Sequence, residues 1–182
     1  MRYNYLKVNF TDVKEPGLYK IKYNTSVSPI FRIDNDVYAR GVWQPVLEYF
    51  LPVQMCHMRV NEKYRVWHDC CHMDDAQMAP AHNHIDGYDQ KEGLSKFKPG
   101  EVVPGVNIGG WHDAGDFDLR IESQAGESYI LALAYEAFHP NLDVTSIDQI
   151  NRVTEIHQPD GKNDLLQQVE NGALTVCLLY TS

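Results

Sequence analysis

Residues 109 to 117 read Gly-Gly-Trp-His-Asp-Ala-Gly-Asp-Phe. In this stretch Asp113 and Asp116 stand three residues apart, and Gly115 between them allows the backbone to turn sharply. Two carboxylates on such a turn can point into one small volume, where they can hold a water molecule and take its proton. The apolar segment 130–135 follows, which predicts that the acids lie at the mouth of a buried region.

The spacing of the two acids also fits simpler roles. Asp113 and Asp116 are suited to cap backbone N–H groups at the start of a helix, where the helix dipole favours negative charge. A calcium-binding loop is a second alternative, but its D-x-[DN]-x-[DN]-G pattern fails at Gly115, and its twelfth position is Gln124 rather than Glu. Spacing alone therefore favours the capping role.

The motif at residues 109–117 resembles the GGW(H/Y/F)DAGD(Y/F) signature of glycoside hydrolase family 9, the inverting endoglucanase and cellulase family. Three other segments are similar to parts of the same family. Gln54-Met55-Cys56 resembles its QRC segment, and Cys71-His72 with Asp74-Asp75 resembles its CHxDD segment. Gly17-Leu18-Tyr19 resembles the last strands of the Ig-like domain that often precedes the catalytic domain. The resemblance covers residues 6 to about 176.

The resemblance implies a role for each residue of the motif. Asp116 is the general base that activates the attacking water, and Asp113 helps to orient that water. Trp111, beside the acids, is expected to stack on a pyranose ring, although most aromatic side chains simply belong to a core. His112 stands at a position that varies in the family motif, and no catalytic role is predicted for it.

An inverting glycosidase also needs a second, protonated carboxyl roughly 6.5 to 9.5 Å from the base, across the sugar. In the family this acid is a Glu far downstream, beyond residue 182. The catalytic pair is therefore expected to be incomplete in this chain, and the chain alone is expected to be inactive on a β-glucan.

Cysteines and histidines are dense between residues 56 and 84, in a segment that contains Cys56, His57, His68, Cys70, Cys71, His72, His82 and His84. Thiolate and imidazole ligands suit tetrahedral zinc. Members of the family with an Ig-like domain carry a structural zinc in this region, and the resemblance implies Cys56, Cys71, His72 and His84 as its ligands. His82 competes for the fourth place. The family also allows a calcium site outside this chain.

Two other interpretations of this segment remain open. Buried cysteines can act as small hydrophobic residues, with the histidines at the surface. The run His68-Asp69-Cys70-Cys71-His72 also mimics the H-E-x-x-H motif of metalloproteases, but Asp69 is one carbon shorter than Glu and the segment lacks a helical flank.

The hydrophobic pattern predicts strands near the N-terminus. Short runs rich in Val, Ile, Tyr and Phe, separated by turn residues, occupy residues 6–10, 17–23 and 28–33, as expected of strands in a sandwich. Three strands are too few to be stable alone. By the family resemblance, residues 1–34 are the C-terminal strands of an incomplete Ig-like β-sandwich.

Helical spacing replaces this pattern in residues 35–176, which the resemblance assigns to the first helices of an all-α (α/α)6 toroid, also incomplete. From Asn35-Asp36, an N-cap pair, apolar residues recur at helical spacing as far as Leu51 and predict a helix, which Pro45 and Pro52 should break or kink.

Further along, residues 56–112 predict a long irregular loop, which in a compact domain is usually functional or anchored. Residues 118–138 predict a helix that is apolar on more than one face, as in the inner ring of a toroid, and therefore buried on two sides. A last helix is expected to begin near residue 163.

The composition bounds the class of protein. The chain has 182 residues, of which 43% are hydrophobic and 23% charged, as in globular proteins. A net charge of −9, from 25 acidic and 16 basic residues, argues against nucleic acid or an anionic membrane as a partner, because both require clustered Lys and Arg. No apolar run approaches the roughly 20 residues that span a bilayer. The expected partner is a polysaccharide, and the resemblance implies a secreted, periplasmic or cell-surface protein.

The last six residues, 177–182, read Cys-Leu-Leu-Tyr-Thr-Ser, which one reading frame of a transposon-type sequencing adapter would encode. They are interpreted as a foreign tail, with a native helix or strand end as the alternative. Without Cys177 three cysteines remain, and an odd number does not indicate a disulfide framework.

Two functions follow from these observations. The first is the N-terminal part of an inverting endo-β-glucanase that acts on β-linked plant polysaccharide, with Asp116 as the base. The second is a non-catalytic, zinc-braced module that presents aromatic side chains to a glycan.

Overall fold

The computed structural model describes residues 5–78, 80, 82–83, 89–90, 96–113 and 121–181, and for residues 82, 83, 89, 90 and 178–181 it describes the backbone only. The chain divides into two compact units, Met1–Val46 and Leu47–Ser182. The short helix α1 (Gln44–Tyr49) spans this division. The helix predicted from Asn35-Asp36 is therefore wrong at its start, because residues 35–43 form turns and bends. Pro45 does not break the helix, since it occupies the first turn, where the missing N–H of proline has no helical partner to lose.

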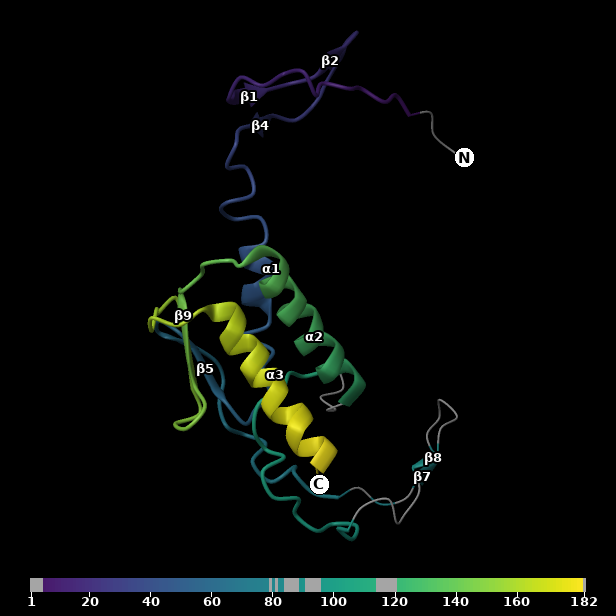
Figure 1. Cartoon of the computed structure of the whole chain (residues 1–182), viewed down its shortest axis with the longest axis vertical. Helices are drawn as coiled ribbons and strands as arrows, with labels where there is room; N and C mark the ends of the chain where they lie inside the picture. Colours follow the sequence, from purple (N-terminus) through teal and green to yellow (C-terminus); the bar gives the residue numbers. More distant parts are fainter. Residues whose placement is uncertain are drawn as a thin grey trace. The chain divides into compact units, whose positions relative to one another are not determined.

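The N-terminal unit contains two small antiparallel strand pairs (Figure 1). Strand β1 (Gly17–Tyr19) pairs with β4 (Phe31–Ile33), and β2 (Lys22–Tyr23) pairs with β3 (Ser26–Val27). The strands predicted at 17–23 and 28–33 therefore form in part. Residues 6–10 form no strand, but the ring of Phe10 lies 5.3 Å from that of Phe31. No sandwich is identified in the described part of this unit.

A four-stranded sheet with the order β6-β5-β10-β9 organises the second unit. Its strands are β5 (Arg59–Glu62), β6 (Arg65–His68), β9 (Thr145–Asp148) and β10 (Val153–Ile156). Strand β5 is parallel to β10, and the two outer pairings are antiparallel. Alternate side chains of the strands point to one face and close a small hydrophobic core, formed by Leu51, Met58, Val60, Ile147 and Ile156.

This sheet corrects the expectation of an irregular loop over residues 56–112. Strands β5 and β6 form a hairpin whose turn includes Lys63 at a φ of 55°. Further along, an isolated antiparallel bridge joins Gln77 to Val102, so this part of the loop is also paired. The parallel pairing escaped prediction because β5 finds its partner β10 more than 90 residues later in the chain.

Helices α2 (Ile121–Phe138) and α3 (Asp164–Thr181) pack against each other, and α3 also contacts β9 (Figure 1). Helix α3 begins where the sequence predicts. The Asn163 side chain caps it, since its Oδ1 accepts hydrogen bonds from the N–H groups of Leu165 and Leu166 at 3.1 and 3.3 Å. Over the described residues, neither helix has the length and apolar character of a membrane span.

The faces of these helices differ from the prediction. Helix α2 is not buried on two sides, because Ile130 is 62% exposed and Phe138 is 79% exposed. The side of α2 that is buried includes Gln124 and Leu131. The buried side of α3 is also largely polar, with fully enclosed Gln168, Asn171 and Thr175. Buried polar side chains require hydrogen-bond partners, and each of these three side chains has one in residues 108–111.

Candidate functional site

The segment 108–113 is held between α3 on one side and the segment 53–56 on the other. Towards α3, the Gly110 N–H donates to the Asn171 carbonyl at 3.0 Å, and the Asn171 Nδ2 donates back to the Gly110 carbonyl at 3.1 Å. The Thr175 hydroxyl donates to the Ile108 carbonyl at 2.7 Å. Three buried groups of one helix therefore position the backbone that leads to the acids.

On its other side the segment pairs with residues 53–55. The Met55 N–H donates to the Gly110 carbonyl at 3.0 Å, the His112 N–H donates to the Val53 carbonyl at 2.8 Å, and an antiparallel bridge joins Gln54 to Trp111. Gln54 is itself fixed by the sheet, since its Oε1 accepts a hydrogen bond from the Thr154 hydroxyl at 2.7 Å. The motif is thereby connected to strand β10.

The first glycine of the motif is required by this close packing. Gly109 has a φ of +67°, a left-handed conformation that side chains with a Cβ rarely adopt. A Cβ at this position would overlap the main-chain carbonyl of Asn171 and lie 3.0 Å from the Thr175 hydroxyl. Glycine is therefore the residue that lets the motif approach α3.

Trp111 is enclosed in the core, with 1% of its surface exposed. Its indole N–H donates to Gln168 Oε1 at 3.2 Å, and its ring meets Phe50 edge-on at 5.4 Å. Gly172 lies against the ring, since a Cβ there would be 2.6 Å from it. In this arrangement neither face of the indole is open to a sugar ring, and Trp111 instead anchors the motif between the helices.

Asp113 is the described carboxylate of the motif, and Asp116 lies outside the described residues. The Ser123 hydroxyl of α2 donates to Asp113 Oδ2 at 3.3 Å. One helical turn further along α2, burial and, to a smaller extent, the negative charge of Asp113 raise the pKa of Glu127. One oxygen of Glu127 is buried without a hydrogen-bond partner among the described residues. The carboxyl groups of Asp113, in the motif, and Glu127, in α2, are thus close enough to interact.

A second group of candidate residues consists of Cys56, Cys71 and His72 and is called the thiol and imidazole group. Cys56 is the last residue of segment 53–56, and Cys71 and His72 follow strand β6. One ligand atom from each of the three lies within 4.8 Å of the other two. The Cys71 sulfur is 3.3 Å from His72 Nδ1, and the His72 N–H donates to the Cys56 carbonyl at 3.3 Å. Cys56 is buried, whereas Cys71 and His72 are exposed.

These three residues fit a metal ion. Zinc holds sulfur at about 2.3 Å and nitrogen at about 2.0 Å in a tetrahedron, so its ligand atoms lie roughly 3.5 to 4 Å apart. The pKa of the Cys56 thiol is raised to about 12, chiefly by burial. A hydrogen bond with the Cys71 thiol and the nearby charges of Cys71, Asp75 and Cys70 add to this shift. A thiol in this setting stays neutral unless a cation compensates for the charge of the thiolate, and a bound metal supplies that cation.

The predicted fourth ligand, His84, lies outside the described residues. His82 belongs to strand β7 (His82–Asn83), which pairs with β8 (Asp89–Gln90), but its side chain is also outside the description. The choice between His82 and His84 as the fourth ligand therefore remains a prediction from the sequence. All four cysteines are free thiols in the structure.

Three further histidines, His112, His68 and His57, lie near the thiol and imidazole group. His112 Nε2 lies 3.3 Å from the Cys56 sulfur, and the His112 ring lies 6.3 Å from that of His68 and 6.5 Å from that of His72. Burial, and then the neighbouring imidazoles, lower the pKa of His112; burial also lowers the pKa of His68. His57 is buried and forms a 2.8 Å contact with Asp75, one of the two acids of the Asp74-Asp75 segment.

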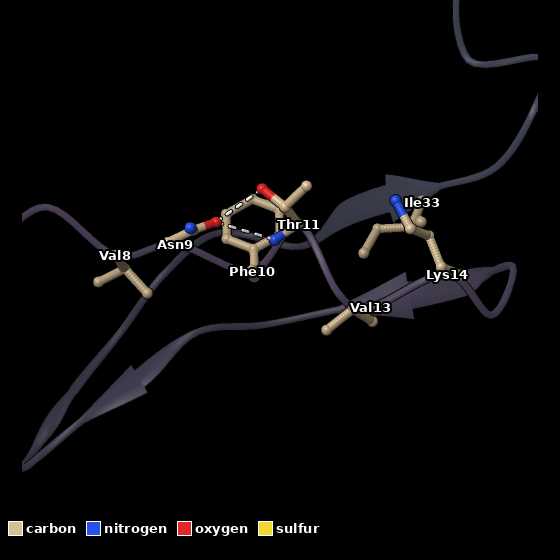
Figure 2. Close-up of a pocket in the computed structure, with 7 residues that line it drawn as sticks. All are labelled: Val8, Asn9, Phe10, Thr11, Val13, Lys14 and Ile33. Carbon is tan, nitrogen blue, oxygen red and sulfur yellow. Dashed lines mark hydrogen bonds between the residues drawn. The ribbon is translucent and has the colours of Figure 1, made fainter.

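The hollow shown in Figure 2 belongs to the N-terminal unit, and none of these residues lines it. Its polar interactions are local, because Asn9 Oδ1 accepts hydrogen bonds from the N–H and the hydroxyl of Thr11 at 3.0 and 2.6 Å. The lining is mostly apolar and consists of Val8, Asn9, Phe10, Thr11, Val13, Lys14 and Ile33.

No protein-family model matches this chain, and neither a curated protein nor a solved structure matches it. The family resemblance therefore rests on the motifs of the sequence itself.

The residues that sequence reasoning missed are buried amides and hydroxyls. Gln124, Gln168, Asn171 and Thr175 position the motif and its preceding residue, and the sequence predicts no such role for them. Polar residues at helical spacing were the available indication: Gln168, Asn171 and Thr175 follow one another at three and four residues, on one face of α3.

Proposed function

We propose that this chain is the N-terminal part of an inverting glycoside hydrolase of the family 9 type, with Asp116 as the general base and Asp113 as the residue that orients the attacking water. The observation that carries the proposal is the anchoring of the motif. Main-chain hydrogen bonds from two segments and side-chain bonds from α3 fix the backbone up to Asp113. A general base must be held within hydrogen-bond reach of one water, which demands such a rigid support.

The position of Asp113 adds to this support. Its carboxylate accepts a hydrogen bond from the Ser123 hydroxyl at 3.3 Å, which ties this acid to the first turn of α2. The second acid of the motif follows after Ala114 and Gly115, so a turn there would bring both carboxylates to the same place. We place the protonated acid of the reaction on a Glu downstream of residue 182, as the resemblance implies.

In the same proposal the thiol and imidazole group is a structural zinc site. Cys56, Cys71 and His72 supply three of the ligands, and His84 or His82 supplies the fourth. When bound, zinc would join the start of β5 to the loop that follows β6, without taking part in hydrolysis. The substrate is a β-linked plant polysaccharide, and the protein is secreted, periplasmic or exposed at the cell surface.

The test uses a polypeptide extended to include the downstream Glu. Asp116→Asn should lower kcat on a soluble β-glucan by about 10² to 10⁴ while the dissociation constant for the glycan changes little, because the amide keeps the size of the carboxylate but cannot accept a proton. Asp118→Asn, two residues along, is the matched control and should retain activity. Glycan binding by an extended chain without any turnover would instead support the non-catalytic module.

A further inference from the structure

We infer that His112 donates a hydrogen bond from its Nε2 to the metal-bound sulfur of Cys56, and so couples the metal site to the turn that carries Asp113. This inference rests on the metal site of the proposed function. It assigns a task to His112, for which the sequence predicts none.

The contact between the two side chains has the geometry of an N–H···S hydrogen bond. His112 Nε2 is 3.3 Å from the Cys56 sulfur, and Cys56 is 6% exposed, so little water competes for the bond. A neutral imidazole carries one N–H, and a metal-bound thiolate is a better acceptor than a thiol because it retains negative charge. The contact therefore becomes stronger when Cys56 holds a metal.

His112 is placed as a donor to a ligand and not as a ligand itself. The three atoms that lie within 4.8 Å of one another belong to Cys56, Cys71 and His72, and His112 is not part of this group. Groups that hydrogen-bond to metal ligands fix the orientation of those ligands, and their loss typically lowers metal affinity about 10-fold to 100-fold.

The backbone carries the effect from the metal site to the carboxylate. The His112 N–H is bonded to the Val53 carbonyl at 2.8 Å, and the Met55 N–H to the Gly110 carbonyl at 3.0 Å. The side-chain bond to Cys56 adds a third attachment between the same two segments, and the next residue is Asp113. Metal binding should therefore restrain the Trp111–Asp113 backbone, and metal loss should loosen it.

The experiment uses the full 182-residue chain loaded with cobalt(II), whose thiolate-to-metal charge-transfer band reports hydrogen bonds to sulfur. His112→Phe removes the donor, His112→Gln keeps an N–H donor, and His68→Phe is the control, because the His68 ring is a neighbour of His112 at 6.3 Å. We expect His112→Phe to move the band to lower energy, to weaken cobalt binding about 10-fold to 100-fold, and to speed amide hydrogen exchange at residues 111–113. His112→Gln should restore part of each change, and His68→Phe should keep the wild-type band.

The outcomes separate this inference from the metal site. A wild-type chain that binds no cobalt refutes the site and the inference together. If His112→Phe binds cobalt with the charge-transfer band and the amide exchange rates of the wild type, the inference is overturned and the metal site stands. The inference is also overturned if the substitution changes the cobalt d–d bands in the way expected for the loss of a ligand.

One measurement needs no variant. In the wild-type chain loaded with spin-active cadmium, scalar coupling between the metal and the His112 ring N–H should pass through the Cys56 sulfur. The absence of this coupling in cadmium-loaded protein would also overturn the inference.

Discussion

The side-chain amide of Gln124 exchanges two hydrogen bonds with the main chain of Trp111: the Trp111 N–H donates to Gln124 Oε1, and Gln124 Nε2 donates to the Trp111 carbonyl, each at 2.9 Å. Both residues are 1% exposed, so no water replaces either bond. This pairing joins α2 to the motif two residues before Asp113. The Gln124 side chain thereby provides hydrogen-bond partners for the N–H and the carbonyl of Trp111, which lies in neither a helix nor a full strand.

Gln124→Met should therefore destabilise the protein by about 2 to 4 kcal/mol, because it keeps the size of the side chain but leaves a buried N–H and a buried carbonyl without partners. Urea unfolding gives the free energy directly. Gln158→Met is the matched control, since Gln158 is exposed, and it should change stability by less than about 0.5 kcal/mol. Equal effects of the two substitutions would contradict the anchoring role.

Two helical glycines provide a second comparison. Gly172→Ala should destabilise by about 1 to 3 kcal/mol, because the added methyl would meet the Trp111 ring at 2.6 Å and also the Ser128 hydroxyl. Gly126→Ala in α2 has open space around it and should stabilise by about 0.5 to 1 kcal/mol through helix propensity. Thermal unfolding of the pair reports the difference, and a stabilising Gly172→Ala would show that α3 does not press against Trp111.

Asp164 predicts a pH dependence of stability. Burial raises its pKa to about 6, although hydrogen bonds from the Val144 and Thr145 N–H groups oppose the shift. A carboxyl with a raised folded-state pKa binds its proton more tightly in the folded protein. Its contribution to stability is therefore present below a pH of about 4, which is the unfolded pKa, and is lost as the pH rises to about 6.

The variant Asp164→Asn keeps an acceptor oxygen and carries no charge. Its free energy of unfolding, measured relative to the wild type, should rise by roughly 1 to 3 kcal/mol between about pH 4 and pH 7 and then stay level. Measuring the difference between the two proteins cancels pH effects that they share, such as metal loss. A difference that stays constant with pH would mean that the N–H groups balance burial, and one that falls would mean that they outweigh it; either would contradict the raised pKa.

Metal binding gives a fourth prediction. The folded chain should bind zinc at about one equivalent, and a chelator should lower its melting temperature, because metal binding free energy adds to folding free energy. Cys56→Ser and Cys71→Ser should each abolish stoichiometric binding, whereas Cys70→Ser should retain it, since Cys70 is not part of the ligand group. Metal analysis of the purified variants decides the matter, and a wild-type pattern in Cys71→Ser would refute the group.

The sequence predicted best what depends on local signals. The start of α3 at its Asn163 cap and the end of α2 at Phe138 follow from capping residues and helical spacing. Cys56, Cys71 and His72 also come together as the motifs implied. The sheet was not predicted, because pairing of β5 with β10 depends on residues far apart in the chain.

The roles of Trp111 and α2 needed the structure for a different reason. Stacking on a sugar and packing in a core use the same apolar surface, and only the neighbours of Trp111, among them Gln168 and Gly172, distinguish the two. Likewise, helical spacing shows that α2 is apolar on several faces, but the exposure of Ile130 depends on which elements lie beside it.

The central claim is that Asp116 is the base of an inverting hydrolase, and the configuration of the product tests it most directly. The extended polypeptide that includes the downstream Glu would be mixed with a soluble β-glucan, and proton NMR spectra would be recorded in the first minutes, before mutarotation. Because water attacks the face opposite the leaving group, the new reducing end should appear first as the α-anomer, and Asp116→Asn should give no product. A β-anomer, or unchanged turnover by Asp116→Asn, would contradict the claim.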